Sequence, residues 1–143
     1  MRVAYVFFAV SSSSRPIRRL SGSAMTHCAI GYGGAVLNVT LRGNQFWPIL
    51  AFAACWPRLC RVFEVPIDRA IDLDRYPAGD RKRIFPSIAR WLTRGLVRTS
   101  DCVCITSELL RDGGVHVPNY IVSPVQLHDW LMARGFRYVE LSP

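Results

Sequence analysis

The sequence lacks the long apolar runs, internal repeats and low-complexity segments that mark membrane, solenoid and disordered proteins. Its best candidate for a membrane helix, from Phe46 to Trp56, contains Pro48 and falls well short of the ~18–20 apolar residues that a span requires. No linker is long enough to divide the chain. The sequence therefore predicts one soluble domain over residues 1–143, with 50% hydrophobic residues to build its core.

Lysine is almost absent, and acidic residues are few. Lys82 is the only lysine among 18 basic residues, which outweigh 10 acidic ones to give a formal charge of +8. This charge favours anionic partners such as wall polymers or nucleic acid, although it also serves solubility. The spacing of Arg90, Arg94 and Arg98 predicts a basic stripe on a helix, either an anionic-polymer contact or an ordinary solvated face. A nucleic-acid interface would add Arg81, Lys82 and Arg83, but no zinc finger or RNA-recognition signature accompanies them.

Cysteine is present in an odd number and without a framework pattern. The five residues Cys28, Cys55, Cys60, Cys102 and Cys104 match neither a dense disulfide scaffold nor paired C-x-x-C zinc ligands. We therefore expect no metal and no cofactor, at least one unbridged thiol, and a reducing compartment such as the cytoplasm. The apolar run at residues 3–10 is at the short limit for a signal peptide and is interpreted as a buried strand.

The order of hydrophobic segments and turn residues predicts an α+β fold. Its firmest element is a β-hairpin of residues 27–32 and 35–41, joined by Gly33-Gly34. A polar turn follows the first strand, with a short helical turn at residues 16–20. An apolar crossover containing Pro48 and Pro57 leads to a strand at 59–67. The remaining expected elements are a charged excursion with a short helix at 68–82, helices starting near Pro86, Cys102 and Ser123, and a closing strand at 136–141.

Two segments carry residues capable of covalent chemistry. His27 opens the hairpin, and Cys102 stands at a helix start, where unpaired N–H groups and the helix dipole favour a thiolate. At about 100° per residue, Cys104 lies on a different side of that helix, so Cys102 is expected to face the sheet and Cys104 to point outward or sideways. Cys28, Cys55 and Cys60 are interpreted as strand or core fillers, and Cys102 itself could be no more than a small buried hydrophobe.

Asn38 is the third candidate residue. It lies among apolar neighbours in the second hairpin strand, where a polar amide costs free energy unless it has a partner. An imidazole is a natural partner for it, and solvent at a strand edge is the alternative. Together, Cys102, His27 and Asn38 make a nucleophile, a base and an orienting residue.

The order of these motifs resembles the circularly permuted papain-like cysteine peptidases and amidases, the branch related to NlpC-type cell-wall hydrolases. The matching segments are Phe7–Ala9, Ile17–Ser23, Thr26–Tyr32, Ala35–Val39, the cysteine segment 101–104 with Leu109-Leu110, and Ser123–Leu127 with Trp130-Leu131. The cysteine segment is similar to that of small phage-encoded members. The orienting residue is often acidic or otherwise polar in this family, so Asn38 is compatible with that role but does not by itself identify the family. Cys104 is the alternative to Cys102 as nucleophile.

The resemblance implies a permuted papain-like domain with a small antiparallel sheet packed on the helix that carries the nucleophile. It implies a thiol-dependent hydrolase or acyltransferase with Cys102 as nucleophile, His27 as base and Asn38 as orienting residue. A peptide, a cell-wall polymer or a lipid acyl group would be the substrate. The alternatives are a catalytically silent papain-like shell that binds virion proteins and an Arg-rich nucleic-acid-binding protein; a phage member would be cytoplasmic or virion-associated.

Overall fold

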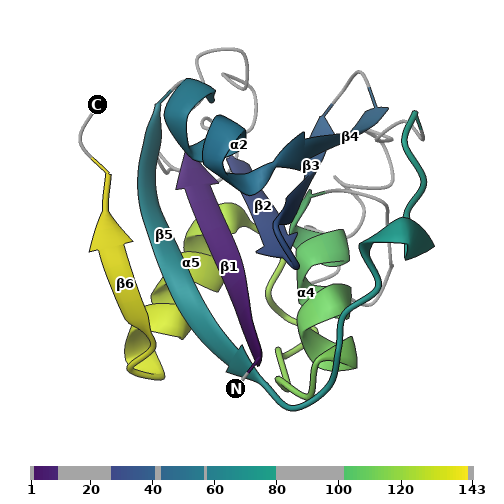
Figure 1. Cartoon of the computed structure of the whole chain (residues 1–143). Coiled ribbons are helices and arrows are strands. Elements are labelled where there is room, and N and C mark those ends of the chain that lie inside the picture. The colour runs from purple at the N-terminus through teal and green to yellow at the C-terminus, as the bar shows by residue number, and fades with distance from the viewer. Residues whose placement is uncertain (1, 10–26, 41–42, 57, 80–101, 142–143) are drawn as a thin grey trace.

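A six-stranded antiparallel sheet forms the centre of the α+β structure (Figure 1). The computed structural model describes residues 2–9, 27–40, 43–56, 58–79 and 102–141. The strand order is β4-β3-β2-β1-β5-β6. The strands are β1 (Arg2–Ala9), β2 (His27–Tyr32), β3 (Ala35–Thr40), β4 (Gly43–Pro48), β5 (Leu59–Ile67) and β6 (Arg137–Glu140). The described helices are α2 (Ile49–Cys55), the 3-10 turn η2 (Leu73–Arg75), α4 (Cys102–Asp112) and α5 (Pro124–Ala133).

The β2–β3 hairpin forms as its Gly-Gly turn predicts. Gly33 and Gly34 have φ values of 61° and 84°, a region that residues with a side chain rarely adopt. The turn places Ile30 opposite Leu37 across the two strands. A shift of one residue would exchange buried and exposed faces, so this turn also fixes which side chains meet between the two strands.

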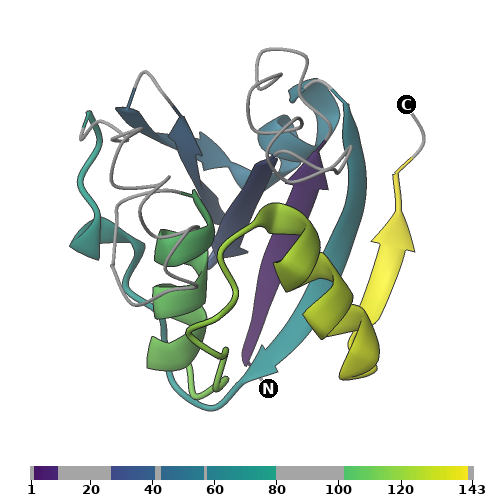
Figure 2. The same ribbon diagram turned by 180° about the vertical axis from the view of Figure 1, so that it is seen from behind.

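Helices cover both faces of the sheet. Figure 1 shows α2 in front of the sheet, and Figure 2 shows α4 and α5 packed against the opposite face. The larger core lies under α4 and α5 and includes Phe8, Ile30 and Leu110, while a smaller core around Phe52 lies under α2. The elements that we expected at residues 3–10, 59–67, 102–111, 124–133 and 136–141 are present, with ends shifted by one or two residues.

The prediction of a crossover segment between the hairpin and β5 is wrong. That segment is a regular strand, β4, followed directly by helix α2. Pro48 is compatible with both elements, because the last residue of a strand needs no further ladder bond and its φ of −58° suits a helix start. The helical turn expected at residues 16–20 and the helix expected after Pro86 lie outside the described residues.

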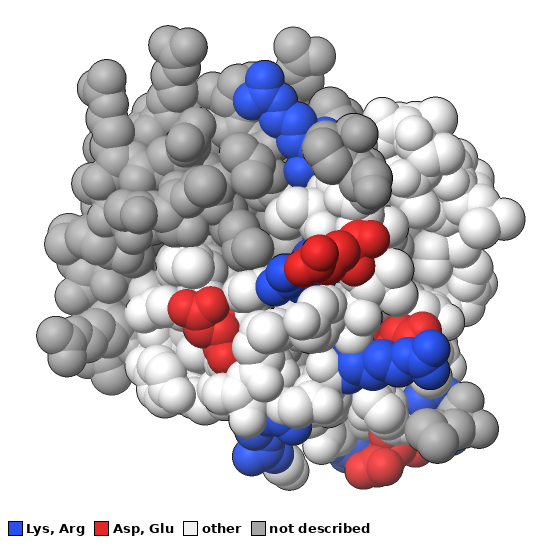
Figure 3. Space-filling view, turned by 90° about the vertical axis from the view of Figure 1, so that its left-hand side faces the viewer, with Lys and Arg blue, Asp and Glu red and all other residues white. Residues whose placement is uncertain are grey.

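Two ion pairs link β5 to β6 on the side of the molecule where β6 lies. Figure 3 shows acidic and basic groups next to each other on this side of the surface. Arg61 and Glu140 approach to 2.5 Å, and Arg137 and Glu64 to 3.5 Å, each pair joining β5 to β6. Exposed pairs of this kind add little stability, about 0–1 kcal/mol each, so they mainly keep an open edge strand charged.

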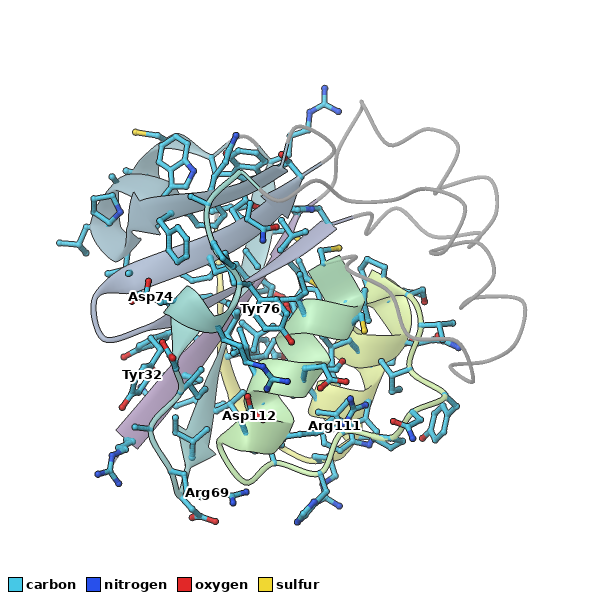
Figure 4. The ribbon with its side chains drawn as sticks, turned by 90° about the vertical axis from the view of Figure 1, so that its right-hand side faces the viewer. Tyr32, Arg69, Asp74, Tyr76, Arg111 and Asp112 are labelled. Carbon is cyan, nitrogen blue, oxygen red and sulfur yellow. The ribbon has the colours of Figure 1, made fainter. Side chains whose placement is uncertain are left out.

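The segment after β5 is held against α4. Arg75 donates to the Asp112 carboxylate at 2.5 Å, and Figure 4 shows Asp74 and Tyr76 beside the helix that carries Arg111 and Asp112. Burial raises the pKa of the Tyr76 hydroxyl above its ordinary value, although the Arg75 guanidinium opposes this. None of the described helices has the length and apolar composition that crossing a membrane would need.

Helix α5 begins with a capping box, which offers a direct test of the fold. The Ser123 hydroxyl accepts from the Gln126 backbone N–H at 3.3 Å, and the Gln126 side chain accepts from the Ser123 N–H at 3.1 Å. We expect Ser123→Ala to lower the free energy of unfolding by about 1 kcal/mol in urea titration. Ser123→Thr retains a capping oxygen and should recover most of that loss; equal stability of the Ala variant and the original chain would contradict the cap.

Candidate active site

His27 and Asn38 form a buried hydrogen-bonded pair. His27 is the first residue of β2 and is 8% exposed, whereas Asn38 in β3 is fully buried. Continued one residue beyond the Ile30–Leu37 pair, the hairpin register puts Asn38 opposite Ala29, and His27 is then its diagonal neighbour on the same face. The distance from His27 Nε2 to Asn38 Oδ1 is 2.5 Å. The imidazole partner expected for Asn38 is therefore present.

This hydrogen bond assigns the two ring nitrogens of His27. A carboxamide oxygen only accepts, so Nε2–H of His27 is the donor. The neutral ring then has an unprotonated Nδ1, which is the atom available to take a proton. Asn38 thus sets the tautomer in which His27 can act as a base, as an orienting residue does.

Trp56 covers the His27 ring. The ring centroids lie 5.7 Å apart with an interplanar angle of 33°. Trp56 follows α2 and stacks on Phe52 at 5.5 Å and 18°, so the helix holds the indole in place. An aromatic cover excludes water from the His27–Asn38 bond and strengthens it. Sequence reasoning missed Trp56, and the available signal was the apolar run from Phe46 to Pro57, which we interpreted only as a crossover.

Asn38 retains one donor without a partner. Its Nδ2 is a buried side-chain atom with no hydrogen-bond partner among the described residues, a property it shares with the hydroxyl of Ser107. An unsatisfied buried amide costs about 1–3 kcal/mol relative to a satisfied one. An aliphatic side chain would avoid this cost in a strand whose neighbours are Leu37 and Val39. A cost of this kind is typical of a residue retained for its chemistry rather than for packing.

Cys102 occupies the first position of α4. It is 3% exposed and belongs to the larger core, so the expectation that it faces the sheet is confirmed. Cys104 was expected to point outward or sideways; it is 4% exposed, buried on the side of α4 where it interacts electrostatically with Tyr76. Helix α4 is therefore buried on the side of Cys104 as well as on the side that faces the sheet, which sequence periodicity alone does not reveal. Asp101, the residue before the helix, lies outside the described residues.

Helix α4 runs in the same direction as β2. In the first half of α4, Thr106 Oγ1 lies 3.8 Å from Sγ of Cys28, near the start of β2. Just after the end of α4, the Gly113 carbonyl accepts from the Asp68 N–H at 2.8 Å, and Asp68 directly follows the last residue of β5. The end of β5 pairs with the start of β1, at the edge of the sheet where β2 finishes. The start of α4 therefore lies at the edge where β2 begins.

This direction brings Cys102 to the end of the sheet at which His27 lies. Cys102 precedes Thr106 by one helical turn, about 6 Å along the axis, which corresponds to about two residues of strand. Because Thr106 lies against Cys28, Cys102 lies at or just beyond the level of His27, the first residue of β2. The order and direction of these elements set the expected nucleophile and the expected base at one end of the sheet.

The two side chains approach that end from different faces. Side chains alternate along a strand, and Cys28 and Ile30 belong to the core under α4, whereas Ala29 belongs to the core under α2. His27 therefore points to the α2 face, in agreement with its contact to Trp56. Because the sheet separates the two faces, the thiol and the imidazole can meet only beyond the end of the sheet at which β2 begins.

The other three cysteines differ in exposure. None of the five cysteines, all of which lie among the described residues, forms a disulfide. Cys28 and Cys60 lie in strands as expected, and the Cys60 thiol donates to the Phe8 carbonyl at 3.3 Å. Burial raises the pKa of Cys60. Cys55 contradicts its expected role as a core filler, because it is exposed at the end of α2.

Neither a group of metal ligands nor the expected basic stripe is found among the described residues. Within the described ranges, no three His, Cys, Asp or Glu side chains are grouped as metal ligands. The basic stripe of Arg90, Arg94 and Arg98 lies outside the described residues, as do Arg81, Lys82 and Arg83. Comparison with known proteins adds no relative: no family model, no curated protein and no solved structure matches the chain.

Proposed function

We propose that the protein is a thiol-dependent hydrolase or acyltransferase with a permuted papain-like fold, in which Cys102, His27 and Asn38 act together. The buried His27–Asn38 hydrogen bond, in which the Asn38 amide keeps a donor that has no partner among the described residues, is the observation that carries the proposal. The resemblance in motif order adds to it, since the base-bearing hairpin precedes the cysteine-bearing helix. Peptide, cell-wall and lipid acyl groups all suit this chemistry.

The reaction begins when His27 Nδ1 takes the proton of the Cys102 thiol. The sulfur attacks the acyl carbonyl, and backbone N–H groups at the start of α4 stabilise the oxyanion that develops. The carbon–leaving-group bond then breaks, and the imidazolium gives its proton to the departing amine or alcohol. Water, deprotonated by His27, attacks the thioester and releases the acid and the thiol; another nucleophile in place of water would give acyl transfer.

The reactivity of the Cys102 thiol tests this proposal directly. At pH 6 an ordinary thiol is about 0.3% thiolate, whereas a thiol paired with an imidazole is mostly ionised. We expect iodoacetamide at pH 6 to modify Cys102 about tenfold or more faster than the exposed Cys55, as measured by mass spectrometry of peptides. The advantage should disappear in His27→Ala.

A second candidate function is a catalytically silent shell that serves as a structural or virion-associated binding protein. The observation that favours it is the burial of Cys102 on the face of the sheet opposite to His27. In that case Cys102 would react more slowly than Cys55 at every pH, and His27→Ala would leave both rates unchanged. Such a result would refute the hydrolase and leave the fold intact.

A further inference from the structure

His128 is a buried histidine that the proposed reaction does not use. It lies in α5 and is 7% exposed. Its ring packs edge-on against Phe8 of β1 and Phe63 of β5, with both pairs of ring centroids 5.4 Å apart. Figure 2 shows α5 lying across this face of the sheet. Burial among aromatic rings disfavours a charged imidazole unless its two nitrogens have partners that stabilise the charge.

The partners of the two ring nitrogens define the protonation state of His128. Nε2 lies 2.7 Å from Nη1 of Arg61, and Nδ1 lies 2.9 Å from Oδ1 of Asp129. A guanidinium can only donate, so Nε2 accepts and carries no proton. Nδ1–H then donates to the Asp129 carboxylate, and the ring as a whole is neutral. A second proton, on Nε2, would remove the acceptor of Arg61 and set two cationic N–H groups against each other.

The charged groups around His128 come from α5, β5 and β6. The Arg61 side chain is 19% exposed, whereas the carboxylates of Asp129 on α5 and Glu140 on β6 are 71% and 70% exposed. Solvent therefore screens the two carboxylates, which favour a protonated ring, more than the guanidinium, which opposes it. The Cys60 thiol, also on β5, donates to a carbonyl of β1. The balance at Nε2 is against a second proton.

Arg61 also contacts both of the C-terminal elements, α5 and β6. Besides His128, it donates to Met132 Sδ of α5 at 3.9 Å and to Glu140 Oε1 of β6 at 2.5 Å. Its guanidinium carbon lies 4.5 Å from the centroid of the Tyr138 ring on β6. Strand β6 is four residues long and exposed throughout. Displacing this guanidinium would therefore weaken contacts to α5 and to β6 at once.

We propose that the Arg61–His128 hydrogen bond is an acid-sensitive link, which holds α5 and β6 on the sheet at neutral pH and breaks when His128 takes up a proton. The guanidinium opposes this proton only in the folded chain. Stability that depends on the neutral ring is present above about pH 6.5, the ordinary titration point of histidine, and is lost as the pH falls below it. The link needs no thiol chemistry, so it is independent of the proposed function.

Urea unfolding of the full chain at pH 7.5 and pH 5 tests the link. Between these pH values, the folding equilibrium constant should fall about tenfold or more further in the original chain than in His128→Gln, whose amide oxygen accepts from Arg61 at either pH. The limit, for a ring that takes up no proton before unfolding, is about thirtyfold. Arg61→Met removes the donor but keeps His128, and it should lose this pH dependence as well. His116→Gln removes an exposed histidine and should retain it, as the matched control.

Hydrogen exchange of the same proteins locates the change. At pH 5, after correction for intrinsic exchange rates, amide protection in the original chain should fall in α5 and β6 while β2 and β3 stay protected. In His128→Gln, α5 and β6 should keep their protection at pH 5.

Each other outcome contradicts the proposal. Equal pH dependence in the original chain and His128→Gln would overturn it, as would a pH dependence that Arg61→Met leaves intact. If His128→Gln does not fold, the comparison of Arg61→Met with the original chain still decides. Loss of the pH dependence in His116→Gln would assign it to the exposed histidine. Uniform loss of protection throughout the sheet at pH 5 would show global acid unfolding instead of release of α5 and β6.

Discussion

Replacing His27 by Ala is expected to lower kcat for hydrolysis of an activated acyl ester or thioester by about 10²–10⁴-fold, the range typical for loss of a general base. The expectation follows from the tautomer that Asn38 imposes, which leaves Nδ1 of His27 as a proton acceptor at the end of the sheet where α4 begins. Steady-state kinetics on purified protein measures the effect. Because the base acts on the thiol rather than on substrate binding, KM should change much less than kcat.

Matched variants make this prediction specific. His116 is an exposed histidine elsewhere on the surface, so His116→Ala should retain full turnover. Cys55→Ser removes an exposed thiol and should also be neutral, whereas Cys102→Ser should abolish turnover. Full activity in His27→Ala would disprove the assigned base. Activity that survives in Cys102→Ser but is lost in Cys104→Ser would transfer the nucleophile to Cys104, the other buried thiol of α4.

The parts of the fold that sequence predicted are those with local determinants. Gly33-Gly34 dictates a tight turn whatever surrounds it, and Ser123 with Gln126 specifies where α5 begins. Residues 46–57 had no such determinant. A short apolar run without polar residues has no periodicity, so it does not distinguish β4 and α2 from irregular chain.

The candidate site divides in the same way. The His27–Asn38 pair was predictable because both residues belong to one hairpin, whose turn fixes the register between them. The cover of His27 by Trp56 was not, because it depends on the position of α2 over the sheet. The sequence also did not show that α4 packs on the face opposite to His27. Alternation along the strand indicates that His27 and Cys28 point to opposite faces, but not which of the two faces α4 covers.

Phe8→Ala is expected to have the largest effect on stability. Phe8 lies fully buried in β1, between β2 and β5, and its ring packs edge-on against Phe63 at 5.6 Å and His128 at 5.4 Å. Truncating a buried Phe costs about 3–5 kcal/mol, because apolar burial is lost and a cavity remains. Domains are typically stable by only about 5–15 kcal/mol, so urea unfolding should shift strongly.

The neighbouring residue Phe7 separates stability from function. Phe7 points to the opposite face, where its ring lies 5.2 Å from Phe52 of α2. Phe7→Ala should destabilise less, because the core under α2 is smaller. It should nevertheless loosen the helix that holds Trp56 over His27 and so lower kcat in protein that is still folded. Val139→Ala, at an exposed site, should change the free energy of unfolding by less than about 0.5 kcal/mol. A loss of stability as small as this for Phe8→Ala would contradict the central position of β1 between two layers of helices.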